Sequence, residues 1–206
     1  MQGYIVKIIP TKSEDLILKI LTPKSLRSFY RFYGARHSTI ALGRKIDFDE
    51  VFSPHFLPQA RNILHLFHQW EKEYERVYAW QNFVRLLERH LSEVEEVEEF
   101  YFNLLEKSAL HLERQNPLRA LLESYVGLLA YEGRLLRQEQ NRCFLCDGVL
   151  DSHIVLAQSF LFAHPHCVNG TPMQKQAILE FLHTQKSLNL DDSDVEKLWK
   201  VLCLGF

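Results

Sequence analysis

The stretch G-Y-I-V-K-I-I, residues 3–9, begins a series of short apolar runs that continues through the first 70 residues. Further runs of isoleucine, leucine, phenylalanine, tyrosine and valine, with partial alternation, follow at residues 16–22, 26–36 and 39–48. Turn-forming sequences at residues 22–24 and 34–38 separate them, as expected for short strands. Several short strands in close succession are typical of a small β-barrel. Residues 58–67 fit either a fifth strand or a helix.

Beyond about residue 69 the apolar residues recur at helical rather than strand spacing. Asn116-Pro117 and Thr171-Pro172 each supply an N-cap and a proline for the first helical position, and Ser92-x-x-Glu95 has the pattern of a capping box. These signals predict helices over residues 71–91, 93–115, 117–138, 172–186 and 193–205. The predicted fold class is therefore α+β, with a small β-barrel domain at residues 1–70 and an α-helical domain at 71–206.

Two short pairs of metal-ligand residues, Cys143-x-x-Cys146 and His164-x-x-Cys167, lie on either side of one loop. Each pair wraps one side of a small ion, and the loop brings the second pair to the other side. This pattern is typical of a tetrahedral structural zinc site. We therefore predict that a zinc-binding loop at residues 141–170 is inserted in the helical domain. The alternative is a finger of reduced cysteines that no longer binds metal.

The histidine that completes this site has two candidates. His164 keeps a two-residue gap to Cys167, whereas His166 adjoins Cys167 and has poor chelating geometry, so His164 is the predicted ligand. Cys203 lies in an apolar helical sequence and is predicted to be a small buried residue rather than a fifth ligand. A catalytic zinc site is not predicted, because the sequence has no H-E-x-x-H and no H-x-E paired with P-C-x-x-C.

The net charge of −2 conceals a strong asymmetry along the chain. Residues 1–45 hold nine lysines and arginines but only two acidic residues, whereas the remaining residues hold 15 basic and 24 acidic ones. A basic first quarter on an acidic body predicts an anionic partner for one end of the protein. The alternative is a solvated surface whose charges happen to segregate.

Residues 26–33, L-R-S-F-Y-R-F-Y, have two different faces if they form a strand. The odd positions carry guanidinium groups and aromatic rings, and the even positions suit a barrel lining. Cations for phosphates and flat rings for bases are what a single-stranded nucleic acid requires. The predicted DNA-binding residues are the cations Lys24, Arg27, Arg31, Arg36, Arg44 and Lys45 and the stacking rings Phe29 and Tyr33. The alternative is that both rings pack beneath the helical domain while the arginines extend to solvent.

Other functional classes find little support in the sequence. No P-loop, Gly-rich dinucleotide turn or nucleophile elbow is present, so the chain is not predicted to be an enzyme. The acidic run at residues 93–99 is predicted to be a solvated face in the first turns of a helix. No apolar run of about 18 residues and no signal peptide is found, and the cysteine usage favours a reducing interior. A cytoplasmic protein without a membrane span is therefore expected.

The order of these features resembles the RecO family of bacterial recombination mediators and DNA-repair proteins. The opening M-Q-G-Y-I-V and the following T-K-S-E-D-L-I-L resemble the first strands of the family. Gly34-Ala35-Arg36 resembles its K-G-A-R turn, and residues 118–136 resemble the helix before its finger. Cys143-x-x-Cys146-Asp147-Gly148 resembles its C-x-x-C-G knuckle. The resemblance covers nearly the whole chain.

Three positions depart from the family pattern. Tyr33 replaces the lysine of K-G-A-R, which weakens one phosphate contact and adds a stacking ring. Asp147 precedes the knuckle glycine, and His164 stands where many members have cysteine, which keeps a metal site but alters its affinity. The acidic body predicts that DNA contact is confined to the N-terminal domain.

The resemblance implies an OB-fold barrel followed by a helical bundle with a zinc finger. It also implies binding of single- and double-stranded DNA, annealing of complementary strands, and partnership with RecR and the single-stranded-DNA-binding protein. Through these partners the protein would help to load the RecA recombinase, which associates it with the nucleoid. An alternative from another class is a protein-interaction adaptor with a structural zinc site and no DNA binding.

Overall fold

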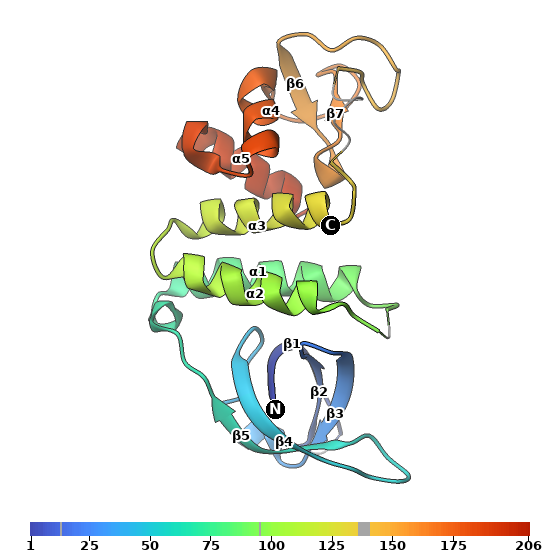
Figure 1. Cartoon of the computed structure of the whole chain (residues 1–206), viewed down its shortest axis with the longest axis vertical. Helices are drawn as coiled ribbons and strands as arrows, with labels where there is room; N and C mark the ends of the chain where they lie inside the picture. Colours follow the sequence, from blue (N-terminus) through green and yellow to red (C-terminus); the bar gives the residue numbers. More distant parts are fainter. Residues whose placement is uncertain (13, 95, 136–140) are drawn as a thin grey trace. The chain divides into compact units, whose positions relative to one another are not determined.

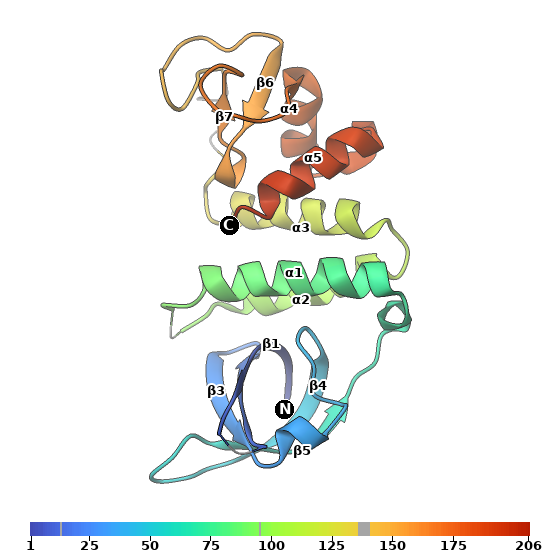
Figure 2. The same cartoon turned by 180° about the vertical axis from the view of Figure 1, so that it is seen from behind.

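The computed structural model describes residues 1–12, 14–94, 96–135 and 141–206. The chain divides into two compact units, Met1–Arg114 and Gln115–Phe206. The first unit holds a β-barrel and the helices α1 and α2, and the second holds the helices α3, α4 and α5 and a small sheet (Figures 1 and 2). The division between the units thus follows α2, whereas the sequence analysis drew the domain boundary before α1.

Five strands close the barrel in the order β1-β2-β3-β5-β4. They are β1 (Gln2–Pro10), β2 (Leu16–Leu21), β3 (Leu26–Arg31), β4 (Lys45–Val51) and β5 (Gln59–His65). The first residues of β1 pair with β4 and the rest of the strand pairs with β2, while β3 and β5 are parallel neighbours. A closed five-stranded barrel of this kind is an OB-fold. The predicted fold class is confirmed, and residues 59–65 form a strand rather than a helix.

The sequence analysis expected the even positions of β3 to line the barrel, but the structure turns Phe29, an odd position, into the core. On the neighbouring strand, the core residue Leu18 stands opposite Phe29. The core residue Ile20 likewise stands opposite Arg27. Because opposite residues share a face, Phe29 faces the barrel interior, whereas the side chain of Arg27 is exposed and pairs with Glu50. Phe29 is fully buried there, and its ring meets Phe48 edge-on at 5.2 Å.

Two strands also have different ends from those predicted. β3 ends at Arg31 because Tyr33 adopts a left-handed conformation, with φ 50°, and Gly34–Arg36 form a short 3₁₀ helix. The strand predicted from residue 39 begins only at Lys45. The sequence signal for strands is an apolar run, and such a run does not reveal where a turn interrupts it.

Tryptophan side chains attach the helices of the first unit to the barrel and to one another. These helices are η2 (Gln69–Lys72), α1 (Tyr74–His90) and α2 (Glu99–Leu112). Nε1 of the buried Trp80 donates to the carbonyl oxygen of Gly43 at 2.8 Å. Gly43 has φ 82°, and a Cβ atom there would lie 2.6 Å from Trp80 Nε1, so the contact requires glycine. Trp70 of η2 donates in the same way to Ala109 of α2 at 2.9 Å.

Ion pairs reinforce this attachment. Lys7 and Lys19, on paired strands of the barrel, both reach Glu88 of α1 at 3.1 Å. Glu88 is only 5% exposed, so these pairs are better shielded from water than surface pairs. Lys45 of β4 reaches Glu106 of α2 at 2.8 Å. Part of the positive charge of the first 45 residues is therefore used within the unit itself.

The acidic run before α2 lies mostly outside the helix. α2 begins at Glu99 with Glu98 as its N-cap, so the prediction of a helix from residue 93 is wrong. Glu95, the second residue of the expected capping box, lies outside the described residues. The described acidic residues of the run are exposed, as a solvated segment requires.

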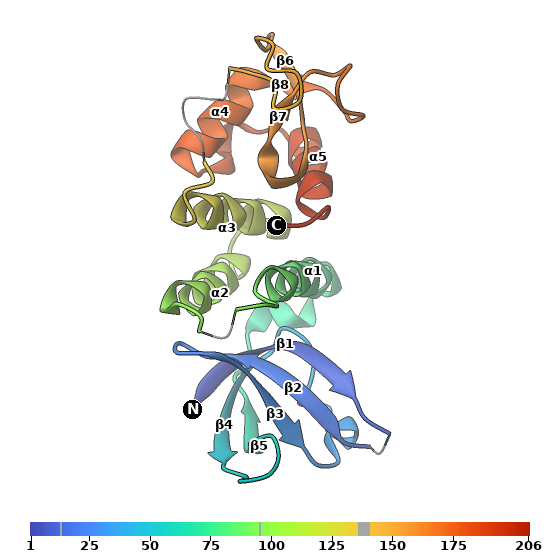
Figure 3. The same ribbon diagram turned by 90° about the vertical axis from the view of Figure 1, so that its right-hand side faces the viewer.

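The second unit combines a small three-stranded sheet with the helices α3, α4 and α5 (Figure 3). Its elements are α3 (Pro117–Tyr131), β6 (His153–Leu156), η3 (Gln158–Phe160), β7 (Phe162–Ala163), β8 (Met173–Gln174), α4 (Lys175–Thr184), η4 (Ser187–Asn189) and α5 (Asp192–Leu202). Asn116 caps α3 as predicted, accepting from two backbone N–H groups. The helix predicted from Pro172 begins at Lys175 instead, because β8 first pairs with β6. The helix predicted over residues 117–138 ends at Tyr131, so the prediction is wrong for residues 132–135, and its last residues lie outside the described ones.

A buried carboxylate links the helices of this unit. Glu123 of α3 accepts hydrogen bonds from the backbone N–H and the hydroxyl of Ser187, at 2.9 and 2.8 Å. Burial raises the pKa of Glu123, but hydrogen bonds from Ser187, Gln115 and Lys186 outweigh burial, so the pKa is lowered. The carboxylate is therefore a charged anchor for the segment that precedes α5. No helix in the described part of the chain is long and apolar enough to cross a membrane.

Candidate nucleic-acid interface and metal centre

The fold brings the four predicted metal ligands together in the second unit. The Sγ atoms of Cys143, Cys146 and Cys167 and a ring nitrogen of His164 all lie within 4.8 Å of one another. Nδ1 of His164 lies 3.3 Å from Cys146 Sγ and 3.9 Å from Cys167 Sγ. A tetrahedral zinc site with such donors has edges of about 3.5–3.8 Å. The four ligand atoms thus lie close enough together, and have the right chemistry, to hold a metal ion.

His164 rather than His166 turns its ring into this cluster. Nε2 of His164 hydrogen-bonds to the carbonyl oxygen of Val149 at 2.9 Å, which leaves Nδ1 facing the sulfur atoms. An outer hydrogen bond of this kind commonly orients a metal-bound imidazole. His166 is exposed and stacks on His164 with ring centres 4.8 Å apart. Cys203 was predicted to be buried, but it is exposed at the end of α5.

A tight turn shapes the first pair of ligands. The N–H of Asp147 donates to the carbonyl oxygen of Cys143, and the N–H of Cys143 donates to that of Gly148, both at 2.9 Å. Asp147 has φ 57°, a left-handed conformation that aspartate adopts more readily than most residues. A Cβ atom on Gly148 would lie 3.2 Å from His164 Cε1. Glycine at this position therefore lets the second pair approach the first.

Hydrogen bonds tune the protonation of the cluster. Burial raises the pKa of Cys143, but backbone hydrogen bonds from Cys146, His164 and Leu145 outweigh burial and lower this pKa to about 6. Burial raises the pKa of Cys167 to about 11. Thiolates are the form of cysteine that binds metal, so a bound ion would displace the remaining thiol protons.

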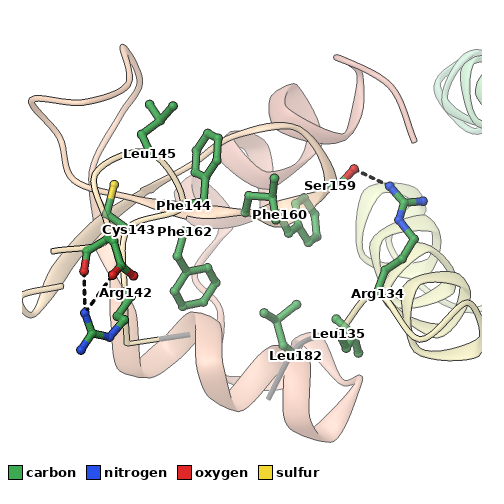
Figure 4. Close-up of a pocket in the computed structure, with 12 residues that line it drawn as sticks. Arg134, Leu135, Arg142, Cys143, Phe144, Leu145, Ser159, Phe160, Phe162 and Leu182 are labelled. Atoms are coloured by element: carbon green, nitrogen blue, oxygen red, sulfur yellow. Dashed lines mark hydrogen bonds and ion pairs between the residues drawn. The ribbon is translucent and has the colours of Figure 1, made fainter. Parts of the chain in front are cut away.

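A cavity of about 440 Å³ lies beside the knuckle (Figure 4). Its apolar lining includes Phe144, Phe160 and Leu182, and Arg134 and Arg142 border it. Both arginines already have partners, since Arg134 bonds to Glu132 and Ser159 and Arg142 bonds to Asp147. The cavity therefore offers a mixed surface, with apolar side chains beside polar ones. It escaped the sequence analysis because its lining comes from four separate segments.

In the first unit, the six cations predicted to contact phosphate fall into two groups. Lys24, Arg27 and Arg36 are exposed. Arg27 pairs with Glu50, and Arg36 pairs with Glu14. In the described part of the chain no ion pair involves Lys24. Exposed pairs of this kind are worth only about 0–1 kcal/mol, so an incoming phosphate can replace the carboxylate.

The other three predicted cations are held by the protein. Arg31 donates to the carbonyl oxygen of Ala60 at 3.1 Å. Arg44 bonds to the backbone of Ser38 and lies 3.8 Å from Glu71. Lys45 pairs with Glu106 of α2, as described above, and its side chain is only 15% exposed. Phosphate contact by these three residues would require each to give up a structural interaction.

The two rings predicted to stack on bases have different environments. Phe29 is 0% exposed, so the prediction that it forms a stacking platform is wrong. It packs inside the barrel rather than beneath the helices, because the closed sheet turns its face inward. Tyr33 is 59% exposed, and the guanidinium of Arg36 lies 5.2 Å from the centre of its ring. Tyr33 therefore presents the ring and the cation that a single strand requires.

Two exposed rings escaped the sequence analysis. Phe52 and Phe56 lie in the loop between β4 and β5 and are 80% and 82% exposed. This loop is one of those through which OB-folds contact oligonucleotides. The available sequence signal was the pair of prolines at 54 and 58, which places both rings in a loop rather than a strand.

The comparison with known families agrees with this architecture. Residues 1–71 match the family described as RecO N terminal. The chain carries a RecO N-terminal domain. The resemblance to the RecO family is thereby confirmed, and the match ends where the barrel gives way to the helices. No curated protein matches the chain. A RecO N-terminal domain indicates a role in DNA repair and recombination.

The burial of Phe29 predicts the effect of removing its ring. Phe29→Ala should destabilise the first unit by about 3–5 kcal/mol, because it opens a cavity against Phe48. The matched substitution Phe56→Ala removes the same ring from an exposed site and should change stability by less than about 0.5 kcal/mol. Urea denaturation followed by tryptophan fluorescence measures both. A stable Phe29→Ala protein with weakened DNA binding would show that Phe29 is a surface ring after all.

The ligand cluster predicts a selective effect of its two histidines. His164→Ala should lose the bound metal, expected to be about one zinc ion per chain, and should loosen residues 141–174. His166→Ala is the matched control and should keep the metal, because its ring does not face the sulfur atoms. Elemental analysis gives the metal content, and hydrogen exchange resolves the two units. Equal metal content and protection in His164→Ala and the unaltered protein would rule out His164 as a ligand.

Proposed function

We propose that this RecO-type protein is a non-catalytic DNA-binding mediator of repair and recombination. In this proposal the barrel binds DNA through phosphate contacts and ring stacking, and the second unit is held together by a structural zinc ion. The single observation that carries the proposal is the match of residues 1–71 to the RecO N-terminal domain, on a closed barrel of OB type. OB-folds commonly bind oligonucleotides.

The charges of the barrel support binding to the DNA backbone. Arg27 and Arg36 are exposed, and each is paired with a carboxylate at the surface. Phosphate can take the place of that carboxylate at little cost in free energy. Lys24 offers a further exposed cation. We therefore assign these three residues to phosphate contacts and assign Lys45 to the attachment of α2.

The proposed activity needs no catalytic residue. Annealing requires a surface that holds one strand by its phosphates and leaves its bases free to pair. We propose that the protein binds both single- and double-stranded DNA and anneals complementary strands in this way. By family analogy alone, it would act with RecR and the single-stranded-DNA-binding protein at the nucleoid, and so help to load RecA.

A zinc ion would act in this protein as a structural element. Cys143, Cys146, His164 and Cys167 would hold it, and its contribution would be to fix the knuckle against the small sheet. A tetrahedral site with four protein ligands has no open position for a substrate. The proposal therefore gives the second unit a supporting role.

The alternative function is a protein-interaction adaptor. The observation that favours it is the cavity beside the knuckle, whose mixed apolar and polar lining offers a surface for a protein segment. An adaptor of this kind would have no appreciable affinity for DNA at physiological salt. DNA binding therefore separates the two functions directly.

Salt dependence of binding tests the proposed function. The affinity for a labelled single-stranded oligonucleotide, measured by fluorescence anisotropy, should fall steeply as salt rises, because phosphate neutralisation releases counterions. Arg27→Ala/Arg36→Ala should reduce the slope of log affinity against log salt by about 1.4, the value expected for two lost phosphate contacts.

The matched control removes two exposed cations from the helices of the same unit, Arg89→Ala/Lys107→Ala, and should leave the slope unchanged. Both double variants change the net charge equally, so a general electrostatic effect would move them together. Absence of binding by the unaltered protein at low salt would contradict the proposed function and favour the adaptor.

A further inference from the structure

The loop between β4 and β5 exposes more aromatic surface than any other loop in the described barrel. Residues 52–58 read F-S-P-H-F-L-P, and Phe52 and Phe56 are 80% and 82% exposed. Leu57 adds a third apolar side chain that is 39% exposed. Single exposed apolar residues are common on protein surfaces. Two highly exposed phenylalanines in one seven-residue loop form a concentrated apolar surface, and such surfaces commonly mark binding sites.

The backbone restricts the conformations of this loop. Pro54 and Pro58 each fix their own φ angle, which reduces the number of conformations available to the loop. Its ends are tied by the pairing of Val51 with Gln59 and by the hydrogen bond from the N–H of Tyr30 to the carbonyl oxygen of Pro58, at 2.8 Å. The two rings therefore lose little conformational entropy when they bind a partner.

The same contacts place this loop beside the end of β3. Tyr30 of β3 is the partner of Gln59, and the next residue, Arg31, stands opposite Leu16 at the start of β2. The β4–β5 loop and the turn between β1 and β2 thus flank the last residues of β3. The segment that follows β3 exposes two further rings, Phe32 at 48% and Tyr33 at 59%.

Exposed cations lie on the strands and segments that adjoin these loops. The guanidinium of Arg36 lies over Tyr33, Arg61 is exposed on β5, and Arg27 pairs with Glu50 at the end of β4. Rings alternating with cations match a single strand of nucleic acid, which exposes base faces along a line of phosphates. A duplex hides the faces of its bases in the stack, so it offers these rings no partner except at its ends.

We propose that Phe52 and Phe56 stack on unpaired bases and give this protein a preference for single-stranded over duplex DNA. The inference rests on the proposed DNA-binding function and adds the residues that determine its specificity. In annealing, the two rings would hold bases apart from their neighbours until the complementary strand displaces them. The phosphate contacts of the arginines serve both forms of DNA, whereas the rings serve only the single strand.

The test compares ring variants of the full chain on two probes. The probes are a labelled oligothymidine of about 16 nucleotides and a duplex of the same length closed by a hairpin at each end. Phe52→Leu/Phe56→Leu keeps the apolar character of the loop but removes both rings, and Phe52→Tyr/Phe56→Tyr keeps the rings. Thermal unfolding of each variant confirms that the barrel is intact.

We expect the leucine variant to lose about fivefold or more in affinity for oligothymidine for each stacked base, with little change on the closed duplex. The tyrosine variant should bind both probes as the unaltered protein does. Unchanged oligothymidine affinity in the leucine variant would overturn the inference, as would an equal loss on both probes. If the leucine variant kept its affinity for DNA but lost binding to anionic lipid vesicles, the inference would also be overturned. The loop would then be assigned to a membrane surface.

Failure of the proposed function has a different signature. If the unaltered protein binds neither probe at low salt, then both the function and the inference fail. If it binds both probes and the leucine variant matches it, DNA binding stands and only the role of the two rings is contradicted.

Discussion

Closure of the five-stranded barrel is the constraint on which the rest of the first unit depends. β1 pairs with β2 along most of its length and with β4 at its start, which closes the sheet. In a closed sheet each strand has one face toward the core and one face toward the outside. The inner face of β3 carries Phe29, which fills the core against Phe48. Any ring that contacts a ligand must therefore come from the outer face or from the loops. The exposed rings Tyr33, Phe52 and Phe56 all lie in loops that follow β3 or β4.

The positive charge of the first 45 residues has two separate uses. Lys7, Lys19 and Lys45 pair with glutamates of α1 and α2, which attaches the helices to the barrel. Arg27 and Arg36 form exposed pairs whose carboxylate partners a phosphate can replace. The basic character of the segment is thus partly structural, and Arg27, Arg36 and the exposed Lys24 remain for an anionic partner.

Local patterns in the sequence predicted some features well. The strands of the barrel appear as apolar runs, and the pair spacing of Cys143, Cys146, His164 and Cys167 predicted a cluster that the fold brings within 4.8 Å. The cap at Asn116 was predictable because side chain and backbone meet within three residues. All of these signals depend on residues close together in the chain.

Features set by distant contacts were not predictable in the same way. The stretch L-R-S-F-Y-R-F-Y has apolar residues at both odd and even positions, so only pairing with β2 decides that Phe29 faces inward. The partner of Lys7, Glu88, lies 81 residues away. The exposure of Phe52 and Phe56 depends on the barrel leaving their loop uncovered, whereas composition alone favours burial of phenylalanine.

We propose that DNA binds to the barrel and its loops, and photo-crosslinking is the most direct test. A single strand containing iododeoxyuridine, irradiated with the full-length protein and mapped by mass spectrometry, forms covalent bonds with aromatic side chains that touch its bases. The account predicts crosslinks at Tyr33, Phe52 or Phe56, and none at the buried Phe29. Crosslinks confined to residues 115–206 would contradict it, because they would place the DNA on the second unit and leave the barrel without its proposed ligand.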